Sequence, residues 1–299
     1  MKPHRFDQTM RWRALAAAAL ALGGLLAAPS AGDASASKHS TPAAHSTSLV
    51  RVIVESEPGQ TARADRAVMG LGGDVVSTQP SLGTLVVDLP LSAVDELGAS
   101  SGVRSVTPDS RVRLQTTGTG PAEHPGDLVN VARGIGAMTY WRQGYFGQGV
   151  DVALLDSGVL PVEGMLTRNK LVIGPDLSFE SQQPELTHLD TFGHGTHMAG
   201  IIGGLDRGLT AETFSSDTRF VGMAPATRIV SLKLADAQGN TDVSQVIAAI
   251  DWVVTHAKDP GMNIRVLNLS FGTDSTQDYR LDPLAHAAEV AWSSGIVVV

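Results

Sequence analysis

The strongest constraint on the fold of this 299-residue chain is a set of continuous apolar runs of strand length in its second half. Residues 150–158 read VDVALLDSG, residues 228–236 read RIVSLKLAD, residues 264–272 read IRVLNLSFG and residues 295–299 read GIVVV. Strands that are apolar on both faces are typical of a parallel sheet with helices on both sides. We therefore expect an α/β domain built on a parallel sheet over residues 126–299.

Amphipathic helices are predicted between these runs. In residues 242–257 the apolar side chains recur at helical spacing along one face, with Thr241 or Asp242 as the N-cap. Residues 282–295 begin with Asp282 as an N-cap and end at a glycine. Because ligands of such sheets bind beyond the carboxyl ends of the strands, we expect a site there.

Residues 48–114 show a different pattern. Strands are predicted at residues 49–55, 74–78, 84–90 and 103–108, and helices at residues 60–73 and 92–98. Ser92 and Asp95 occupy the positions of a capping box at the start of the second helix. The order β-α-β-β-α-β is that of a small ferredoxin-like α+β domain. Its sequence does not bring His, Asp and Ser residues together, so we predict no catalytic site in this segment.

The N-terminal 36 residues predict an export signal. Basic residues precede an apolar run at residues 14–28, and Ala34-Ser35-Ala36 fits a signal cleavage site. The run is shorter than the roughly 20 apolar residues of a membrane helix, so a membrane anchor is the weaker alternative. We expect a secreted, extracellular protein with no membrane contact after signal removal. Polar residues 37–47 and the Gly/Pro/Thr-rich residues 115–125 predict linkers.

The composition narrows the classes of function. The formal net charge of −8 at pH 7 argues against a nucleic-acid-binding protein, which would present a basic face. The chain has no cysteine, which excludes disulfides, zinc–thiolate sites and a cysteine nucleophile. Any nucleophile must therefore be an oxygen or a nitrogen.

The segment TFGHGTHMAG, residues 191–200, contains a pair of histidines. A zinc-binding helix motif needs histidines four residues apart with a glutamate between them, whereas His194 and His197 are three apart. His188 and Asp190 could complete a ligand set, so a zinc hydrolase remains an alternative. The following helix supplies no further ligand, and we favour a site without metal or cofactor.

The DSG turn that begins at Asp156 admits two further interpretations. Aspartic proteases place an Asp in such a turn, but they need two copies, and the chain has one. A hydroxyl nucleophile, by contrast, needs an adjacent base, and a histidine base needs a buried carboxylate to orient it. Asp156 could orient His194 in this way, while Gly193 and Gly195 would let the backbone approach a substrate.

Four segments in order, GVDVALLDSGV, HGTHMAGII, GMAPATRIVSLKL and VLNLSFG, resemble the subtilisin-like serine peptidases. The resemblance runs from about residue 126 to residue 299. It implies that Asp156 is the orienting carboxylate, that His194 is the general base, and that His197 is structural. The implied activity is hydrolysis of peptide bonds in protein or peptide substrates.

The same resemblance implies a substrate cleft between two segments. Ser270, Phe271 and Gly272 should line one wall and pair with the substrate backbone. Gly239 and Asn240 should form the opposite wall.

The resemblance also implies roles for the rest of the chain. Residues 48–114 are similar to a propeptide that assists folding and then inhibits the cleft. The family's oxyanion Asn and nucleophilic Ser are expected beyond Val299, so we expect the 299-residue chain to be incomplete and inactive alone. The alternative is a non-catalytic secreted inhibitor or chaperone-like protein that carries a dead peptidase remnant.

Overall fold

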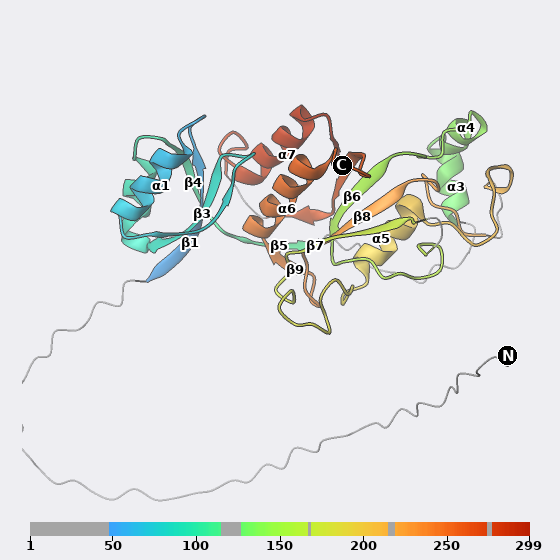
Figure 1. Cartoon of the computed structure of the whole chain (residues 1–299), viewed down its shortest axis with the longest axis horizontal. Helices are drawn as coiled ribbons and strands as arrows, with labels where there is room; N and C mark the ends of the chain where they lie inside the picture. The colour runs from blue at the N-terminus through green and yellow to red at the C-terminus, as the bar shows by residue number, and fades with distance from the viewer. Residues whose placement is uncertain (1–47, 115–126, 167–168, 215–218, 274–276) are drawn as a thin grey trace, which may run out of the picture. The chain divides into compact units, whose positions relative to one another are not determined.

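The computed structural model describes residues 48–114, 127–166, 169–214, 219–273 and 277–299 (Figure 1). All of them belong to one compact unit, Ser46–Val299. The expected signal segment and both expected linkers lie outside the described residues. Within the described residues, no helix is long and apolar enough to cross a membrane.

The ferredoxin-like order predicted for residues 48–114 is present. An antiparallel four-stranded sheet has the order β2-β3-β1-β4, and its strands are β1 (Leu49–Ser56), β2 (Asp74–Gln79), β3 (Thr84–Pro90) and β4 (Val103–Pro108). Helices α1 (Thr61–Gly70) and α2 (Val94–Gly98) follow β1 and β3. Apolar residues from strands and helices form a separate core that includes Val54, Val68, Val87 and Leu97.

The capping box predicted at Ser92 and Asp95 was wrong. Ser92 lies inside a 3₁₀ turn, Leu91–Ala93, which follows Pro90 and runs directly into α2. Neither the turn nor α2 has a hydrogen bond from a side chain at its N-cap. The helical segment thus begins one residue before Ser92, which leaves that hydroxyl too late in the chain to cap it.

The second half of the chain contains the expected parallel sheet. Its five strands have the order β12-β10-β6-β8-β7, and all neighbours are parallel. The strands are β6 (Asp151–Asp156), β7 (Leu171–Asp176), β8 (Arg228–Lys233), β10 (Ile264–Leu269) and β12 (Val297–Val298). Four of these strands coincide with the apolar runs of the sequence, which makes the molecule an α/β protein with a smaller α+β part.

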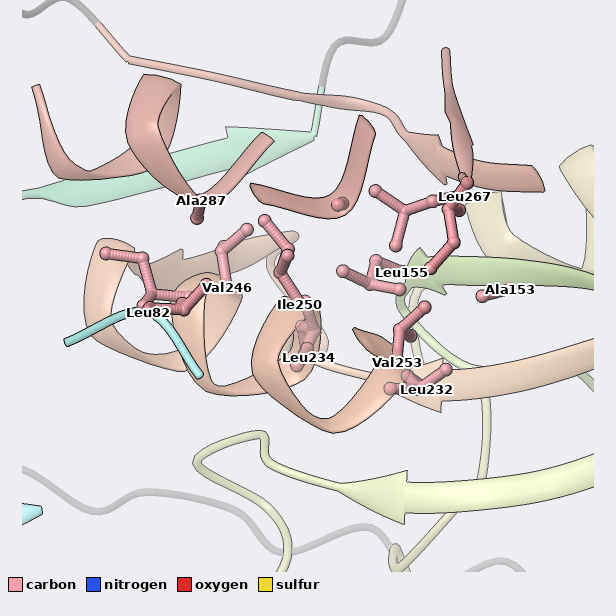
Figure 2. Packing of buried hydrophobic residues seen from close by; sticks show 14 of the residues in the cluster. Leu82, Ala153, Leu155, Leu232, Leu234, Val246, Ile250, Val253, Leu267 and Ala287 are labelled. Carbon is pink, nitrogen blue, oxygen red and sulfur yellow. The ribbon is translucent and has the colours of Figure 1, made fainter. Parts of the chain in front are cut away.

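Helices cover both faces of this sheet. On one face, α6 (Val243–His256) and α7 (Pro283–Ser293) pack against alternate strand residues such as Leu155 and Leu232 (Figure 2). On the other face, α5 (His194–Gly203) packs against Val152, Leu154 and Ile229. Helices α3 (Asp127–Gly134) and α4 (Ala137–Arg142) precede β6, and Ala132 and Trp141 form a further cluster with Phe214.

The helix ends follow the sequence closely. Asp282 caps α7, since its Oδ1 accepts hydrogen bonds from the backbone N–H groups of Leu284 (2.9 Å) and Ala285 (3.0 Å). At the N-cap of α6, the backbone N–H of Asp242 donates to Oε1 of Gln245 at 2.9 Å. Of the two predicted N-cap residues, Thr241 and Asp242, the structure therefore selects Asp242.

A third, three-stranded sheet has the order β11-β5-β9 and joins the two parts of the chain. Strand β5 (Arg111–Leu114) follows the ferredoxin-like part, whereas β9 (Asn240–Asp242) and β11 (Phe271–Gly272) belong to the parallel-sheet part. Both pairings are antiparallel, and β5 is the central strand.

Candidate active site

The carboxylate of Asp156 and the imidazole of His194 meet at the carboxyl end of β6. Nδ1 of His194 lies 2.9 Å from both carboxylate oxygens of Asp156. The Asp156 side chain is 1% exposed and that of His194 is 13% exposed. The sequence places these residues 38 positions apart, and the fold brings them into direct contact.

Glycines permit this close approach. Gly193 is the N-cap of α5 and has a left-handed φ of 94°, which an L side chain rarely adopts. A Cβ on Gly195 would lie 2.0 Å from the carbonyl oxygen of Gly158. Because Gly195 has no side chain, the first turn of α5 can pack directly on the turn that follows Asp156.

The carboxylate of Asp156 is held by its own turn as well. Its Oδ1 accepts a hydrogen bond from the backbone N–H of Ser157 at 2.8 Å, and the Ser157 hydroxyl lies 3.3 Å away. A buried carboxylate bonded to Nδ1 fixes the tautomer of an imidazole and leaves the other nitrogen able to accept a proton. A pair in this geometry can act chemically as an oriented general base.

The alternative metal ligands do not assemble around His194. Both carboxylate oxygens of Asp190 accept hydrogen bonds from nearby backbone and hydroxyl groups, and the backbone N–H of His188 donates to Asp176 at 2.7 Å. Across the described residues, no group of three or more His, Cys, Asp or Glu side chains could hold a metal ion. The zinc set of His188, Asp190, His194 and His197 is thus not brought together there.

The residues predicted to line the cleft lie around the central strand β5. On one side, Phe271 and Gly272 pair with Leu114 and Arg113. On the other side, Asn240 pairs with Arg113. The neighbouring Gly239 and Ser270 directly precede the two outer strands. All five predicted cleft residues are therefore at or next to strands that flank one extended segment.

Phe192 connects this region with the histidine. Its ring centroid lies 6.5 Å from that of His194. On its other side, a Cβ on Gly239 would lie 3.0 Å from the Phe192 ring, so the ring packs over this glycine. No role was predicted for Phe192, although its position two residues before His194 indicates that it lies near the imidazole.

A buried ion pair fixes the loop that carries Phe192. Nζ of Lys233, at the end of β8, donates to Oε2 of Glu180 at 2.6 Å and to the carbonyl oxygens of Leu186 and Leu189 at 3.0 and 2.6 Å. The same Glu180 oxygen accepts from the hydroxyl of Thr191 at 2.7 Å. Burial alone would raise the pKa of Glu180, but hydrogen bonds and the charge of Lys233 lower it below the ordinary value.

Polar contacts join residues 48–114 to the parallel-sheet part. Both carboxylate oxygens of Asp109 accept hydrogen bonds from Ser244, at 3.0 Å from its backbone N–H and 2.6 Å from its hydroxyl. Ser244 lies in the first turn of α6, so Asp109 satisfies a free N–H of that helix. Burial, and then the charge of Asp109, raise the pKa of Asp242. Three further hydrogen bonds join the two parts of the chain. They link the backbone N–H of Ser81 to Asp251, the carbonyl oxygen of Leu82 to His286, and the hydroxyl of Thr107 to Gln277.

Two protein families match the chain. The family described as "Subtilase family" matches residues 147–299, which is half of the chain and includes Asp156 and His194. The family described as "Putative peptidase inhibitor domain" matches residues 35–109. The two matches correspond to the parallel-sheet part and to the ferredoxin-like part.

Curated relatives match about half of the chain. Serine protease AprX of Bacillus subtilis is 32% identical over 156 residues, which are 51% of this chain and 32% of the relative. Subtilisin DY of Bacillus licheniformis is 32% identical over 157 residues, which are 52% of this chain and 48% of the relative. The chain thus matches less than half the length of either relative.

Solved structures share the fold. Fervidolysin from Fervidobacterium pennivorans, described as a keratinolytic enzyme related to subtilisin, has a TM-score of 0.57 at 20% identity and covers 84% of this chain and 39% of its own. The epidermin leader peptide processing serine protease of Staphylococcus aureus has a TM-score of 0.57 at 18% identity, with coverage of 84% and 59%. At these identities the likeness concerns the fold alone.

Proposed function

Because the chain belongs to the subtilase family, we propose that it is part of the precursor of a secreted serine endopeptidase. The observation that carries this proposal is the pair of 2.9 Å contacts between Asp156 and Nδ1 of His194 at the end of a buried strand. The substrates are proteins or peptides, and the reaction is acyl transfer to a serine followed by hydrolysis.

In this proposal each residue has a separate task. His194 removes the proton from the attacking serine hydroxyl and later gives it to the leaving amine, while Asp156 keeps the imidazole in the required tautomer. The attacking serine and the oxyanion asparagine follow residue 299. Ser270, Phe271 and Gly272 on one side, and Gly239 and Asn240 on the other, bind the substrate backbone.

Residues 48–114 act as an intramolecular inhibitor in this proposal. The support is the match to a peptidase inhibitor family together with the position of β5 between β9 and β11. A strand in that place occupies the backbone hydrogen-bonding groups that a substrate would use. The domain boundaries, with a signal segment at 1–36 and linkers at 37–47 and 115–125, belong to the same proposal.

The test uses the longer chain that includes the serine. We expect His194→Ala to lower casein hydrolysis by a factor of roughly 10⁴–10⁶, because a triad loses nearly all of its function when its base is removed. His197→Ala is the matched control and should keep most of the turnover when folded. The measurement is initial rate together with labelling by a fluorophosphonate.

Two results would overturn the proposal. One is near-normal turnover by the folded His194→Ala protein. The other is the absence of both hydrolysis and labelling in the longer chain, which would instead support a non-catalytic inhibitor or chaperone-like protein. We expect residues 1–299 alone to hydrolyse no casein.

A further inference from the structure

Asp190 is a buried carboxylate to which the proposed mechanism gives no task. It is 7% exposed, and it accepts hydrogen bonds from several donors on two different segments. These donors are the backbone N–H groups of Phe192, Gly193 and Thr196 and the hydroxyls of Thr196 and Ser157. Asp190 therefore joins two segments of the chain through one carboxylate.

One set of these bonds holds the start of α5. Oδ1 of Asp190 accepts from the N–H of Gly193 at 2.7 Å, and Oδ2 accepts from the N–H of Thr196 at 2.8 Å. These N–H groups lie at the start of α5, where backbone donors have no acceptor within the helix. His194 is the first residue of this helix. Asp190 thereby fixes the backbone that carries the imidazole, and its charge suits the N-terminus of a helix.

The other bond reaches the turn that carries Asp156. The hydroxyl of Ser157 donates to Oδ1 of Asp190 at 2.7 Å, and the same hydroxyl accepts from the N–H of Gly195 at 2.9 Å. The backbone N–H of Ser157 in turn donates to the carboxylate of Asp156 at 2.8 Å. Ser157 thus links Asp190 to the orienting carboxylate and to the first turn of α5.

We propose that Asp190 is a positioning residue that sets the geometry of the Asp156–His194 pair through both of its neighbouring segments. Its carboxylate ties the turn of Asp156 to the helix of His194, so the two side chains cannot shift independently. This inference rests on the proposed role of His194 as general base. Asp190 does not contact the reacting atoms in this scheme.

The test observes the imidazole directly in the full 299-residue chain labelled with ¹⁵N-histidine. The proton on Nδ1 of His194 is assigned by its loss in His194→Gln, and its exchange with water is measured by NMR. The variants are Asp190→Asn and Ser157→Ala, of which the second leaves the bonds from Asp190 to the helix intact. Asp176→Asn is the matched control, since Asp176 holds the same loop through Ser178 and His188 and does not reach α5.

We expect Asp190→Asn and Ser157→Ala each to speed this exchange about tenfold, as the loss of one charge-assisted hydrogen bond implies. Asp176→Asn should leave the exchange unchanged while lowering the melting temperature. Unchanged exchange in the folded Asp190→Asn chain would overturn the inference. A change in Asp190→Asn without one in Ser157→Ala would also overturn it, because Asp190 would then be a helix cap only. Neither the proton exchange nor the melting temperature depends on peptide hydrolysis. A failure of the peptidase proposal can therefore be distinguished from a failure of this inference.

Discussion

At the scale of single residues, the contact between Gly195 and Gly158 is the tightest constraint on the site. The backbone carbonyl of Gly158 cannot move away without displacing the turn of Asp156, which lies two residues before it. A side chain at position 195 would therefore separate the two halves of the candidate dyad.

We predict that Gly195→Ala destabilises the chain by about 3 kcal/mol, because its Cβ would lie 2.0 Å from a backbone oxygen. The measurement is urea unfolding followed by circular dichroism. Gly134→Ala is the control, since nothing lies within 4 Å of a Cβ at that helical position. Equal unfolding midpoints for Gly195→Ala and the unmodified chain would contradict the packing described here.

The sequence was sufficient to predict that Asp156 and His194 lie together, because each stands in a short motif next to a predicted strand or helix end. It was not sufficient for Asp190 or Phe192. The partners of Asp190 are mostly backbone N–H groups, which every residue carries, so no pattern of side chains marks them. The packing of Phe192 on Gly239 joins segments that are distant in sequence.

At the scale of elements, the strands of the parallel sheet that are apolar runs could be predicted, and the strand that is interrupted by glycine and proline could not. Strands β6, β8 and β10 are continuous apolar runs, whereas the edge strand β7 was not predicted. Its sequence LVIGPD contains Gly174 and Pro175, and its residues are mostly half-buried. A Cβ on Gly174 would lie 2.9 Å from the carbonyl oxygen of Ser231, so this glycine marks a close strand approach and not a turn.

The ion pair of Glu180 and Lys233 leads to a prediction about pH. Since the pKa of Glu180 is lowered in the folded chain, its contribution to stability is present above the unfolded pKa of about 4.3. That contribution is lost as the pH falls through the lower, folded pKa. At neutral pH, Glu180→Gln should cost about 3 kcal/mol because it leaves Lys233 buried without its partner charge.

The measurement is the free energy of unfolding of both proteins between neutral and acid pH. The cost of Glu180→Gln should shrink as the pH falls below about 4.3. Glu163→Gln is the control, because Glu163 and Arg207 form an exposed pair, 71% and 79% accessible, at 3.8 Å. A cost for Glu180→Gln that is the same at every pH would show that the carboxylate charge is not what matters.

At the scale of the whole molecule, the ferredoxin-like part and the parallel-sheet part are joined by a short sheet, a few polar contacts and apolar packing. Leu82 of the ferredoxin-like part packs with the core that contains α6 and α7 (Figure 2). The contacts of Asp109 and β5 add backbone hydrogen bonds to this apolar contact. The sequence predicted the ferredoxin-like part and the parallel-sheet part. It did not predict that β5 pairs with β9 and β11, because these strands are distant from β5 in the sequence.

We predict that residues 48–114, made separately, inhibit the proposed mature peptidase. The reason is that β5 pairs with both predicted walls of the cleft and Asp109 binds the first turn of α6. Inhibition is measured as the loss of casein hydrolysis. Asp109→Ala should weaken it about tenfold, the effect of losing charge-assisted hydrogen bonds.

Arg66→Ala provides the control for that experiment, because this α1 residue is exposed and has no contact that the mechanism uses. It should inhibit as well as the unmodified segment. Should residues 48–114 fail to inhibit at high micromolar concentration, their proposed role would be wrong even if the peptidase is active.

The position of β5 between β9 and β11 also limits which polypeptides could bind there in its place. Strands β9 and β11 pair with β5 and not with each other, so a replacement must present both of its backbone edges at once. A residue within a helix or in the middle of a sheet has its N–H and C=O groups already engaged. The choice of substrate would therefore depend on its backbone conformation before it depends on its sequence. In the proposed peptidase, folded proteins would therefore be spared, and locally unfolded chains would be cut.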